Sequence, residues 1–575
     1  MKNLYLTLVF VLSATFAFAQ TTDLDKPRVV APGVISTNTT WTKDNQYFLD
    51  GRVYVEAPAV LTIEEGTVIK GRFSTNTNEV GVLCIQAGAQ IEAVGTLTEP
   101  IIFTSELDSV ALDDDAPTDN GAAGLWGGVV ILGKACLNTV PDVDNIEGIG
   151  ITQADSVRTV YGNVDGTGCD DTDDSGELRY VSIRHCGNEI AADNELNGLS
   201  LGGVGSGTEM EYIEIIYNTD DGIEFFGGVT DLKHAIVAFV DDDSYDIDQG
   251  NRMKGQFWYA IQSSDYGSAE KGGEWDGADS PVDGTPLQTL ELFNATFIGV
   301  NDEEGKTNRA LDIRANGAAQ VHNSIFRNFT AGVRLDRTYD AGTDSYRRFL
   351  AGETAFKNNH FYGVADSTIG GVFTVNGDTI PTGSTESVEE AKWDSAATAD
   401  NNLIAAGELL VNPLSDPAST PTGMHDPRIV DGIAGVVTMS DEPMDGFFDD
   451  VDYPGAFKPA GTNWMAGWSA MWTLGYLTSD LWIVSNEQSI ELDGLNVYPN
   501  PTANFATVEI DGLNDRELTL IFVLDAMGRE ISREAKYSAG GVLSFDIDLS
   551  QLASGSYFVK VGNENKVGTK QIVKN

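Results

Sequence analysis

The fold of this chain is decided by residues 213–261, which read IEIIYNTDDGIEFFGGVTDLKHAIVAFVDDDSYDIDQGNRMKGQFWYAI. Three five-residue runs within this stretch are rich in β-branched and aromatic side chains, at 213–217, 235–239 and 257–261. This composition is typical of short β-strands. Asp-rich turns close in glycine at Gly228 and Gly250, which are 22 residues apart. The stretch therefore predicts short strands that recur with a fixed period.

The same period extends along the chain in both directions. GTVI at 66–69 is followed by GAQI at 88–91, and LDIR at 311–314 is followed by VRLD at 333–336, each at a step of 22 residues. Periods of this length indicate stacked repeats. Helical periodicity is missing between the strands, which argues against leucine-rich, ankyrin and βαβ units. A coil of about 22 residues with two or three short strands predicts one rung of a parallel β-helix, with apolar side chains stacked inside.

The chain is strongly acidic, with 35 Lys and Arg against 87 Asp and Glu in 575 residues and a formal charge of −52. Its field repels phosphate backbones, so we expect cations as companions and no nucleic-acid partner. Hydrophobic residues make up 41% of the chain, which is enough for a packed core. The length exceeds that of one ordinary compact core, so several domains or an elongated repeat are expected.

Residues 1–19 predict a secretory signal peptide, with a basic start, an apolar run and a small-residue cleavage site before Gln20. No later apolar run approaches the ~20 residues of a membrane helix, so no membrane-spanning segment is expected in the mature chain. In an oxidising setting the four cysteines can pair in three ways. Cys169 and Cys186 are the nearest pair in sequence, and two buried free thiols are the alternative.

The period divides the chain into parts. We expect a β-helix body at 20–443, broken by loop insertions near 108–125 and 338–400. The aromatic-rich segment 444–477 predicts a C-terminal cap over the open end of the stack, and an aromatic platform for sugars is the competing interpretation. A linker follows at 478–493.

Residues 494–575 form a separate domain. They hold 8 basic and 10 acidic residues, a net charge of −2, so residues 1–493 carry the remaining −50. Alternating β-rich segments over about 80 residues predict a small β-sandwich.

Four motifs of this domain occur in order: NVYPNP at 496–501, LDAMGR at 524–529, DLSQLASGSYFV at 548–559 and KQIVKN at 570–575. They resemble the type A C-terminal sorting domain of the type IX secretion system. The resemblance implies an immunoglobulin-like sandwich, secretion to the outer cell surface or beyond, and two partners, the outer-membrane translocon and a sortase-like peptidase. The sorting residues it implies are Tyr498, Pro499, Asn500, Pro501, Gly528, Gly555 and Tyr557.

The body carries a second resemblance. Segments 170–184 and 218–228 are similar to segments of secreted β-helix proteins that often precede such tails. The size of the rung is similar to that of the pectin-lyase-like group, and this resemblance implies a right-handed helix. The expected fold class is therefore all-β, a right-handed parallel β-helix followed by a small sandwich.

The segment DTDDSG at 171–176 is the first candidate metal site. Asp171, Asp173 and Ser175 supply oxygens at alternating positions before a glycine, as in a calcium loop. The match is incomplete because Ser182 stands where an EF-hand has Glu. An Asp/Ser turn that satisfies its own backbone is the alternative.

Stacking predicts a second candidate. Rungs in register place Asp220 and Asp221 below Asp242 and Asp243, at offsets of 22 residues, and Asp246 and Asp248 are expected nearby. Carboxylates ~5 Å apart on neighbouring strands repel unless they are staggered, protonated or bridged by a cation. We expect bound Ca²⁺ here, with a solvated acidic edge as the alternative, and no organic cofactor.

Catalytic residues are harder to find in this sequence. Pectate-lyase chemistry needs carboxylates that bind calcium and a basic residue, for which Arg314, Arg334 and Arg184 are candidates. Pairing of these arginines with the abundant carboxylates is the simpler explanation. The five histidines form no HExxH pair, and a nucleophile elbow and a P-loop are both missing. The sequence therefore favours a structural, adhesive or carbohydrate-contacting module, with a calcium-dependent polysaccharide lyase or glycoside hydrolase working in the β-helix groove as the alternative.

Overall fold

The structure is a computed structural model. It describes residues 26–76, 79–108, 122–149, 156–188, 196–263, 269–278, 281–300, 308–338, 342–377, 379–413, 425–430, 439–459, 463–477, 490–491, 494–513, 518–525, 530–537, 541–550, 552–562 and 566–575. The predicted signal peptide lies outside these residues, as do most of the predicted linker and the 109–121 part of the first predicted insertion. No helix in the described part of the chain is long and apolar enough to cross a membrane.

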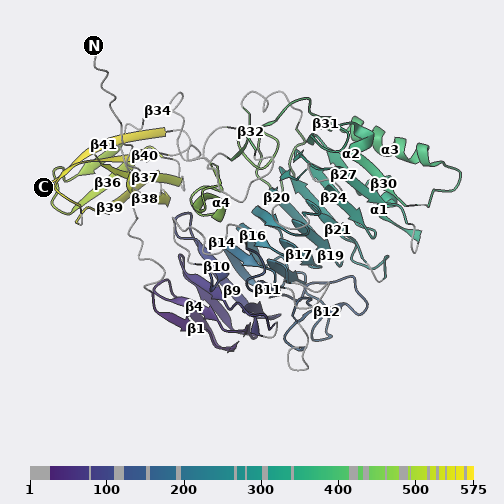
Figure 1. Ribbon diagram of the computed structural model, residues 1–575, viewed down its shortest axis with the longest axis horizontal. Helices are drawn as coiled ribbons and strands as arrows, with labels where there is room; N and C mark the ends of the chain where they lie inside the picture. Colours follow the sequence, from purple (N-terminus) through teal and green to yellow (C-terminus); the bar gives the residue numbers. More distant parts are fainter. Residues whose placement is uncertain are drawn as a thin grey trace, which may run out of the picture.

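The body is a parallel β-helix, as predicted, and each full rung contributes strands to three faces (Figure 1). The first face consists of β3 (Thr39–Trp41), β6 (Val60–Ile63), β9 (Gln90–Val94), the first parts of β14 (Gly176–Cys186), β16 (Glu209–Asn218), β18 (Leu232–Val240) and β20 (Arg252–Ile261), then β22 (Thr289–Phe293), β25 (Ala319–His322) and β28 (Ala355–Lys357). The second face consists of β1 (Arg28–Val30), β4 (Gln46–Leu49), β7 (Val68–Gly71), β10 (Ile101–Ser105), the second parts of β14, β16, β18 and β20, then β23 (Thr296–Ile298), β26 (Ile325–Arg327), β29 (His360–Tyr362) and β31 (Leu403–Ile404). The third face consists of β2 (Val34–Ile35), β5 (Arg52–Val55), β8 (Val82–Ile85), β11 (Val129–Leu132), β15 (Leu199–Gly202), β17 (Ile223–Phe226), β19 (Tyr245–Asp248), β21 (Glu274–Asp276), β24 (Arg309–Arg314), β27 (Ala331–Asp336) and β30 (Phe373–Asn376).

A single residue with positive φ turns the chain from the first face to the second. In four successive rungs this residue carries a ring, and in the next three it is asparagine, which tolerates the left-handed conformation well. Neighbouring rings stack, with centroids 4.3–4.8 Å apart, and this contact offsets the strain of a bulky residue there. The seven corner residues are Tyr180, Tyr212, His234, Phe257, Asn294, Asn323 and Asn358.

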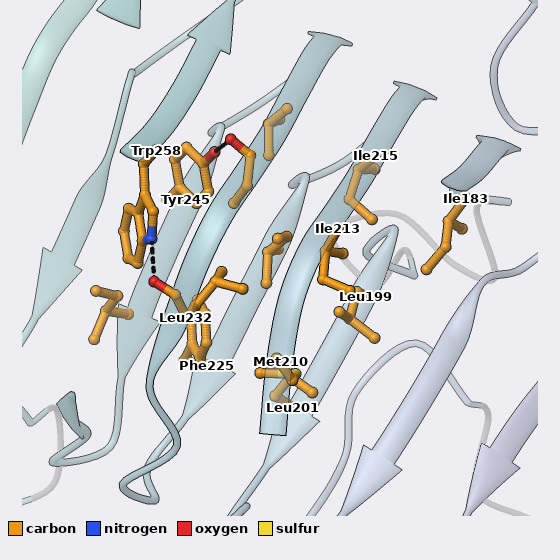
Figure 2. Close-up of a cluster of buried hydrophobic side chains, with 14 of the residues drawn as sticks. Ile183, Leu199, Leu201, Met210, Ile213, Ile215, Phe225, Leu232, Tyr245 and Trp258 are labelled. Carbon is orange, nitrogen blue, oxygen red and sulfur yellow. Dashed lines mark hydrogen bonds between the residues drawn. The ribbon is translucent and has the colours of Figure 1, made fainter. Parts of the chain in front are cut away.

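Apolar side chains fill the inside of the coil in columns that run from rung to rung (Figure 2). On the third face, the register places Leu201, Phe225 and Ile247 above one another, and all are at most 1% exposed. Tyr245 and Trp258 are buried among them, and each donates a hydrogen bond to a backbone carbonyl at 2.9 Å. The core therefore contains large aromatic residues whose polar tips are satisfied.

The C-terminal end of the stack is covered by α1 (Ser345–Leu350), α2 (Ile369–Val372) and α3 (Glu386–Ala399). Trp393 of α3 is 1% exposed and packs edge-on against Phe356 and Phe373 of the last rungs. The prediction that 338–400 is a loop insertion was therefore wrong in part, because this segment supplies the last rung and its cover. An open end of stacked apolar side chains needs such a cover.

The aromatic-rich segment lies elsewhere. We call residues 439–459 and 463–477 the strap; it includes α4 (Ala470–Thr473) and packs along the outside of the second face. That face is apolar on its outer side as well, with Ile216, Ile236 and Ile261 all buried beneath the strap. Glu214, 0% exposed, accepts backbone hydrogen bonds from Ala470 and Met471 at the start of α4. The prediction that 444–477 caps the end of the helix was wrong, because this segment instead shields the apolar outer side of the second face from water.

The C-terminal part forms two small sheets packed around a core of its own, as predicted for a sandwich. One sheet consists of β34 (Ile490–Glu491), β41 (Lys566–Lys574), β40 (Gly555–Gly562), β37 (Leu518–Asp525) and β38 (Glu530–Tyr537), and the other of β35 (Leu495–Tyr498), β36 (Phe505–Asp511) and β39 (Val542–Asp548). Two hairpin-like pairs complete the described strands, β12 (Val143–Asn145) with β13 (Val160–Gly162) and β32 (Leu410–Asn412) with β33 (Asp426–Ile429).

Candidate functional site

The outer side of the third face carries a column of acidic side chains. Strand alternation turns Ile223 and Phe225 into the core and Glu224 outward. The register places residues of successive rungs above one another, in the order Ser200, Glu224, Asp246, Glu274 and Asp312. Neighbouring strands are about 4.8 Å apart, so these carboxylates interact strongly.

Lysine and arginine side chains neutralise the C-terminal part of this acidic column. Lys271 Nζ lies 2.8 Å from Glu274 and 3.1 Å from Asp243. Arg314 lies 2.6 Å from both Glu274 and Asp276. Arg334 forms a two-bonded ion pair with Asp312, which is 0% exposed.

Two of the three predicted catalytic arginines take part in these ion pairs. Arg314 and Arg334 lie on the third face in ion pairs, and nearby carboxylates raise the pKa of Arg314 despite its burial. Arg184 lies on the second face, is 4% exposed and donates from Nε to Ser182. The three arginines therefore do not share a site.

The N-terminal part of the acidic column lies beside further carboxylates from the preceding turns. Asp220, Asp221 and Asp242 each place an oxygen within 4.8 Å of the others, so the structure brings together three of the four residues predicted from stacking. The fourth, Asp243, binds Lys271 instead.

A second group in the same place consists of Asp221, Glu224 and Asp246, whose oxygens also lie within 4.8 Å of one another. Burial is the largest cause that raises the pKa of each well above its usual range, and neighbouring carboxylates raise it further. Burial also raises the pKa of Asp242 to about 6, with Glu270 adding to the effect. Sequence reasoning placed Asp246 near this cluster but missed Glu224, although the alternation of IEFF would have pointed Glu224 outward.

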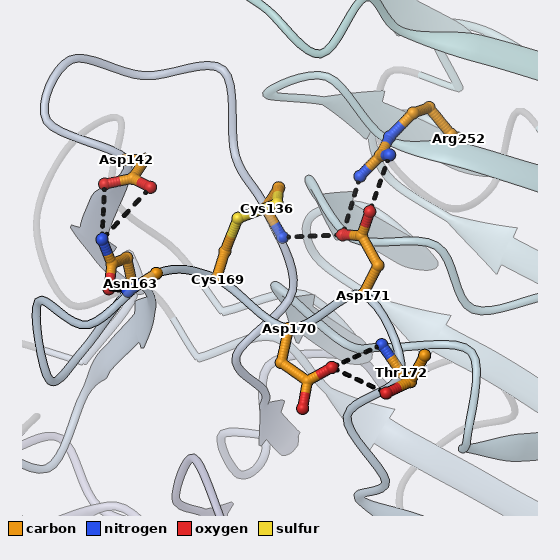
Figure 3. Close-up of a disulfide and its surroundings, with 9 residues drawn as sticks. Cys136, Asp142, Asn163, Cys169, Asp170, Asp171, Thr172 and Arg252 are labelled. Carbon is orange, nitrogen blue, oxygen red and sulfur yellow. Dashed lines mark hydrogen bonds and ion pairs between the residues drawn. A yellow bond between two sulfur atoms is a disulfide. The ribbon is translucent and has the colours of Figure 1, made fainter.

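The predicted calcium loop at 171–176 has its oxygens occupied (Figure 3). Asp171 binds Arg252 at 2.9 and 3.0 Å and accepts a bond from the backbone of Cys136. Asp173 accepts from Ser175 at 3.3 Å. The carboxylates thus serve the turn itself and an ion pair, which matches the alternative considered for this loop.

The same region holds a disulfide between Cys136 and Cys169, with Cα atoms 4.9 Å apart. Of the pairings left open by the sequence, the nearest pair, Cys169 with Cys186, does not form, because Cys186 ends β14 and its side chain packs in the core. Cys84 and Cys186 are buried thiols that take part in no disulfide among the described residues.

A cleft of about 410 Å³ lies between the outer side of the first face and the strap. Arg179 pairs there with Glu177 at 3.0 Å. Lys233 pairs with Asp449 at 3.2 Å and lies 5.1 Å from the ring centre of Phe447. The cleft therefore combines charged groups of both signs with one half-buried aromatic ring.

A family model described as "Pectate-lyase like beta helix domain" matches residues 33–402, more than half of the chain. The chain belongs to this family. In this pectate-lyase-like chain, a second model, "Secretion system C-terminal sorting domain", matches residues 496–575. The chain is thus a substrate of the type IX secretion machinery and is exported to the cell surface or the extracellular space.

The predicted sorting residues lie mostly at strand ends of the C-terminal domain. Tyr498 ends β35 and donates to Glu509 at 2.6 Å, and residues 499–501 follow it directly. Gly555 begins β40, and Tyr557 donates to the Ala553 carbonyl at 2.8 Å. Gly528 lies outside the described residues.

Two solved structures of phage proteins are similar to the pectate-lyase-like chain at low scores. The enzymatically active domain of tailspike protein 2 from bacteriophage CBA120 is 8% identical, with 96% of this chain and 72% of that chain covered and a TM-score of 0.22. Full-length tailspike protein 2 of the Escherichia coli O157:H7 bacteriophage CAB120 is 8% identical, with 96% and 65% covered and a TM-score of 0.20. No curated protein matches the chain.

Proposed function

We propose that this protein is a non-catalytic β-helix module, displayed or released outside the cell, that contacts carbohydrate. The observation that carries the proposal is the state of the three candidate bases: Arg314 and Arg334 are held in ion pairs, and Arg184 is buried. A lyase base must reach the substrate proton, and an arginine that is held in an ion pair or buried is poorly placed to do so.

The cleft on the first face is the proposed carbohydrate contact. Aromatic faces pack on apolar faces of sugar rings, and Phe447 offers such a ring at the edge of the cleft. Arg179 and Lys233 add donors for hydroxyl or carboxylate groups of a sugar. The translocon and a sortase-like peptidase act on the C-terminal domain before this function begins.

The alternative is a calcium-dependent polysaccharide lyase or glycoside hydrolase that works on the third face. It is favoured by the raised pKa values of Asp221, Glu224 and Asp246, since strongly shifted carboxylates are enriched at active sites.

The two proposals are separated by incubating the mature protein with acidic and neutral polysaccharides, while retention, reducing ends and unsaturated products are measured. We expect retention without products, and we expect Phe447→Ala to weaken it about tenfold, the effect of about 1.4 kcal/mol of lost contact. Phe73→Ala is the matched control, because Phe73 is an exposed phenylalanine outside the cleft. Product formation that Arg314→Ala or Asp243→Asn abolishes would establish the enzyme instead.

A further inference from the structure

We propose that Asp221, Glu224 and Asp246 bind one Ca²⁺ ion on the third face, with Ser200 and Asn197 supplying neutral oxygens. The site is independent of the proposed carbohydrate contact, which lies on the first face.

The first support is convergence. Asp221 precedes β17, Glu224 lies within β17 and Asp246 lies in the next rung, on β19. Their oxygens approach one another within 4.8 Å. Asp221 and Glu224 are each only 6% exposed, so water does little to screen their charges. Three carboxylates this close together, two of them buried, are costly to ionise without a counter-charge.

The second support comes from neutral oxygens that have no partner. Ser200 is 1% exposed, lies beside Glu224 in the outward column, and its Oγ has no hydrogen-bond partner among the described residues. Asn197 is 1% exposed and donates from Nδ2 to Glu224 and Glu147, while its Oδ1 also lacks a partner in the described part of the chain. Rotation of this amide by 180° turns Oδ1 toward the carboxylates.

The chemistry of these groups selects the ion. All five side chains offer oxygen, which suits a hard cation, and no nitrogen or sulfur ligand for zinc is among them. Ca²⁺ accepts six to eight oxygens in flexible geometry, whereas Mg²⁺ requires a near-ideal octahedron. Carboxylates from two rungs with a hydroxyl and an amide fit the irregular arrangement of Ca²⁺ better.

The outer group of Asp220, Asp221 and Asp242 shares only Asp221 with this site. Lys271 already offsets the charge of Asp242, whereas other carboxylates are the main charges that act on Glu224 and Asp246. The group of Asp221, Glu224 and Asp246 therefore gains more from a bound cation than the outer group does. Asp242, which belongs only to the outer group, serves as the matched control.

The test uses the full mature protein, stripped with chelator and then titrated with CaCl₂ or MgCl₂ in a calorimeter, with melting followed in parallel. We expect one Ca²⁺ per chain, a Tm rise of about 2–4 °C in calcium, and a smaller response to magnesium. Glu224→Gln and Asp246→Asn should abolish the uptake and the Tm rise, while Asp242→Asn keeps both.

Misfolding of the variants is distinguishable from loss of the ion. Neutralising a carboxylate in a repulsive cluster should leave the Tm in chelator equal to or above that of the wild type. Wild-type protein that takes up no Ca²⁺, or Glu224→Gln and Asp246→Asn proteins that take it up as the wild type does, would overturn the assignment.

Discussion

At the scale of single residues, His425 shows how burial controls a titration. It is 0% exposed, and burial lowers its pKa to about 3, against an ordinary value near 6.5. Its Nε2 lies 2.5 Å from the hydroxyl of Tyr259 on β20, so the neutral ring and the hydroxyl share a hydrogen bond. The folded state therefore binds this proton less readily than the unfolded state does.

The sign of the pH dependence follows from this difference. Between about pH 6.5 and 3 the unfolded chain binds the proton and the folded chain does not, so His425 adds stability at neutral pH that is lost as the pH falls. We expect His425→Gln to flatten the fall of the free energy of unfolding by up to about 1.4 kcal/mol per pH unit in this window. Denaturant unfolding of both proteins at pH 7, 5.5 and 4.5 tests this, and parallel curves would contradict it.

At the scale of elements, the strap is the least expected part of the body. Trp468 is 0% exposed and packs edge-on against Tyr180 and Tyr212 of the aromatic corner. The element is held by packing and by the Glu214 hydrogen bonds to its α4 turn.

Truncation of Trp468 should loosen the strap and leave the β-helix intact. We expect Trp468→Ala to cost about 3–5 kcal/mol of stability and to increase binding of an apolar dye to the uncovered second face. Trp472→Ala is the control, because Trp472 is only half-buried, and its cost should be clearly smaller. Equal losses for the two variants, measured by denaturant unfolding, would argue against the strap as a packed cover.

At the scale of the whole molecule, the chain separates into a strongly acidic coil and a nearly neutral C-terminal domain with its own core. A domain that folds around its own core can be removed without exposing the core of the body. The matched sorting model implies that export depends on this domain.

Deletion of Gly494–Asn575 should therefore leave a folded body in the periplasm. Cell fractionation followed by immunoblotting measures this, and the secreted fraction should fall to background while circular dichroism of the purified body stays β-rich. The control is the full chain with Phe505→Ala, an exposed change on the C-terminal domain that should leave export intact. Normal appearance of the truncated chain outside the cell would refute the dependence.

Much of the body was predictable from the sequence, because a rung is a local unit. In the central rungs the strands repeat every 22 or 23 residues, and there the period specifies which residues stack. Other steps are longer, as from Val181 to Ile213, and the predicted match of 66–69 with 88–91 was wrong, because β7 lies on the second face and β9 on the first. The same arithmetic placed Asp220 and Asp221 beside Asp242. The motifs of residues 496–575 likewise identified the sorting domain, since each is a short continuous segment.

What the sequence by itself determined, then, is the coil, the register of its central rungs, its acidity and its export domain. Only the tertiary structure decided which carboxylates form ion pairs. Arg314 pairs with Asp276 and Arg334 with Asp312, whereas the charges that act most on Glu224 and Asp246 are those of other carboxylates. It also decided that the strap covers the second face and α3 the open end. The physical reason is that burial and ion pairing depend on which segments distant in sequence come into contact. A periodic sequence pattern predicts contacts between successive rungs, but it does not predict contacts with segments outside the repeat.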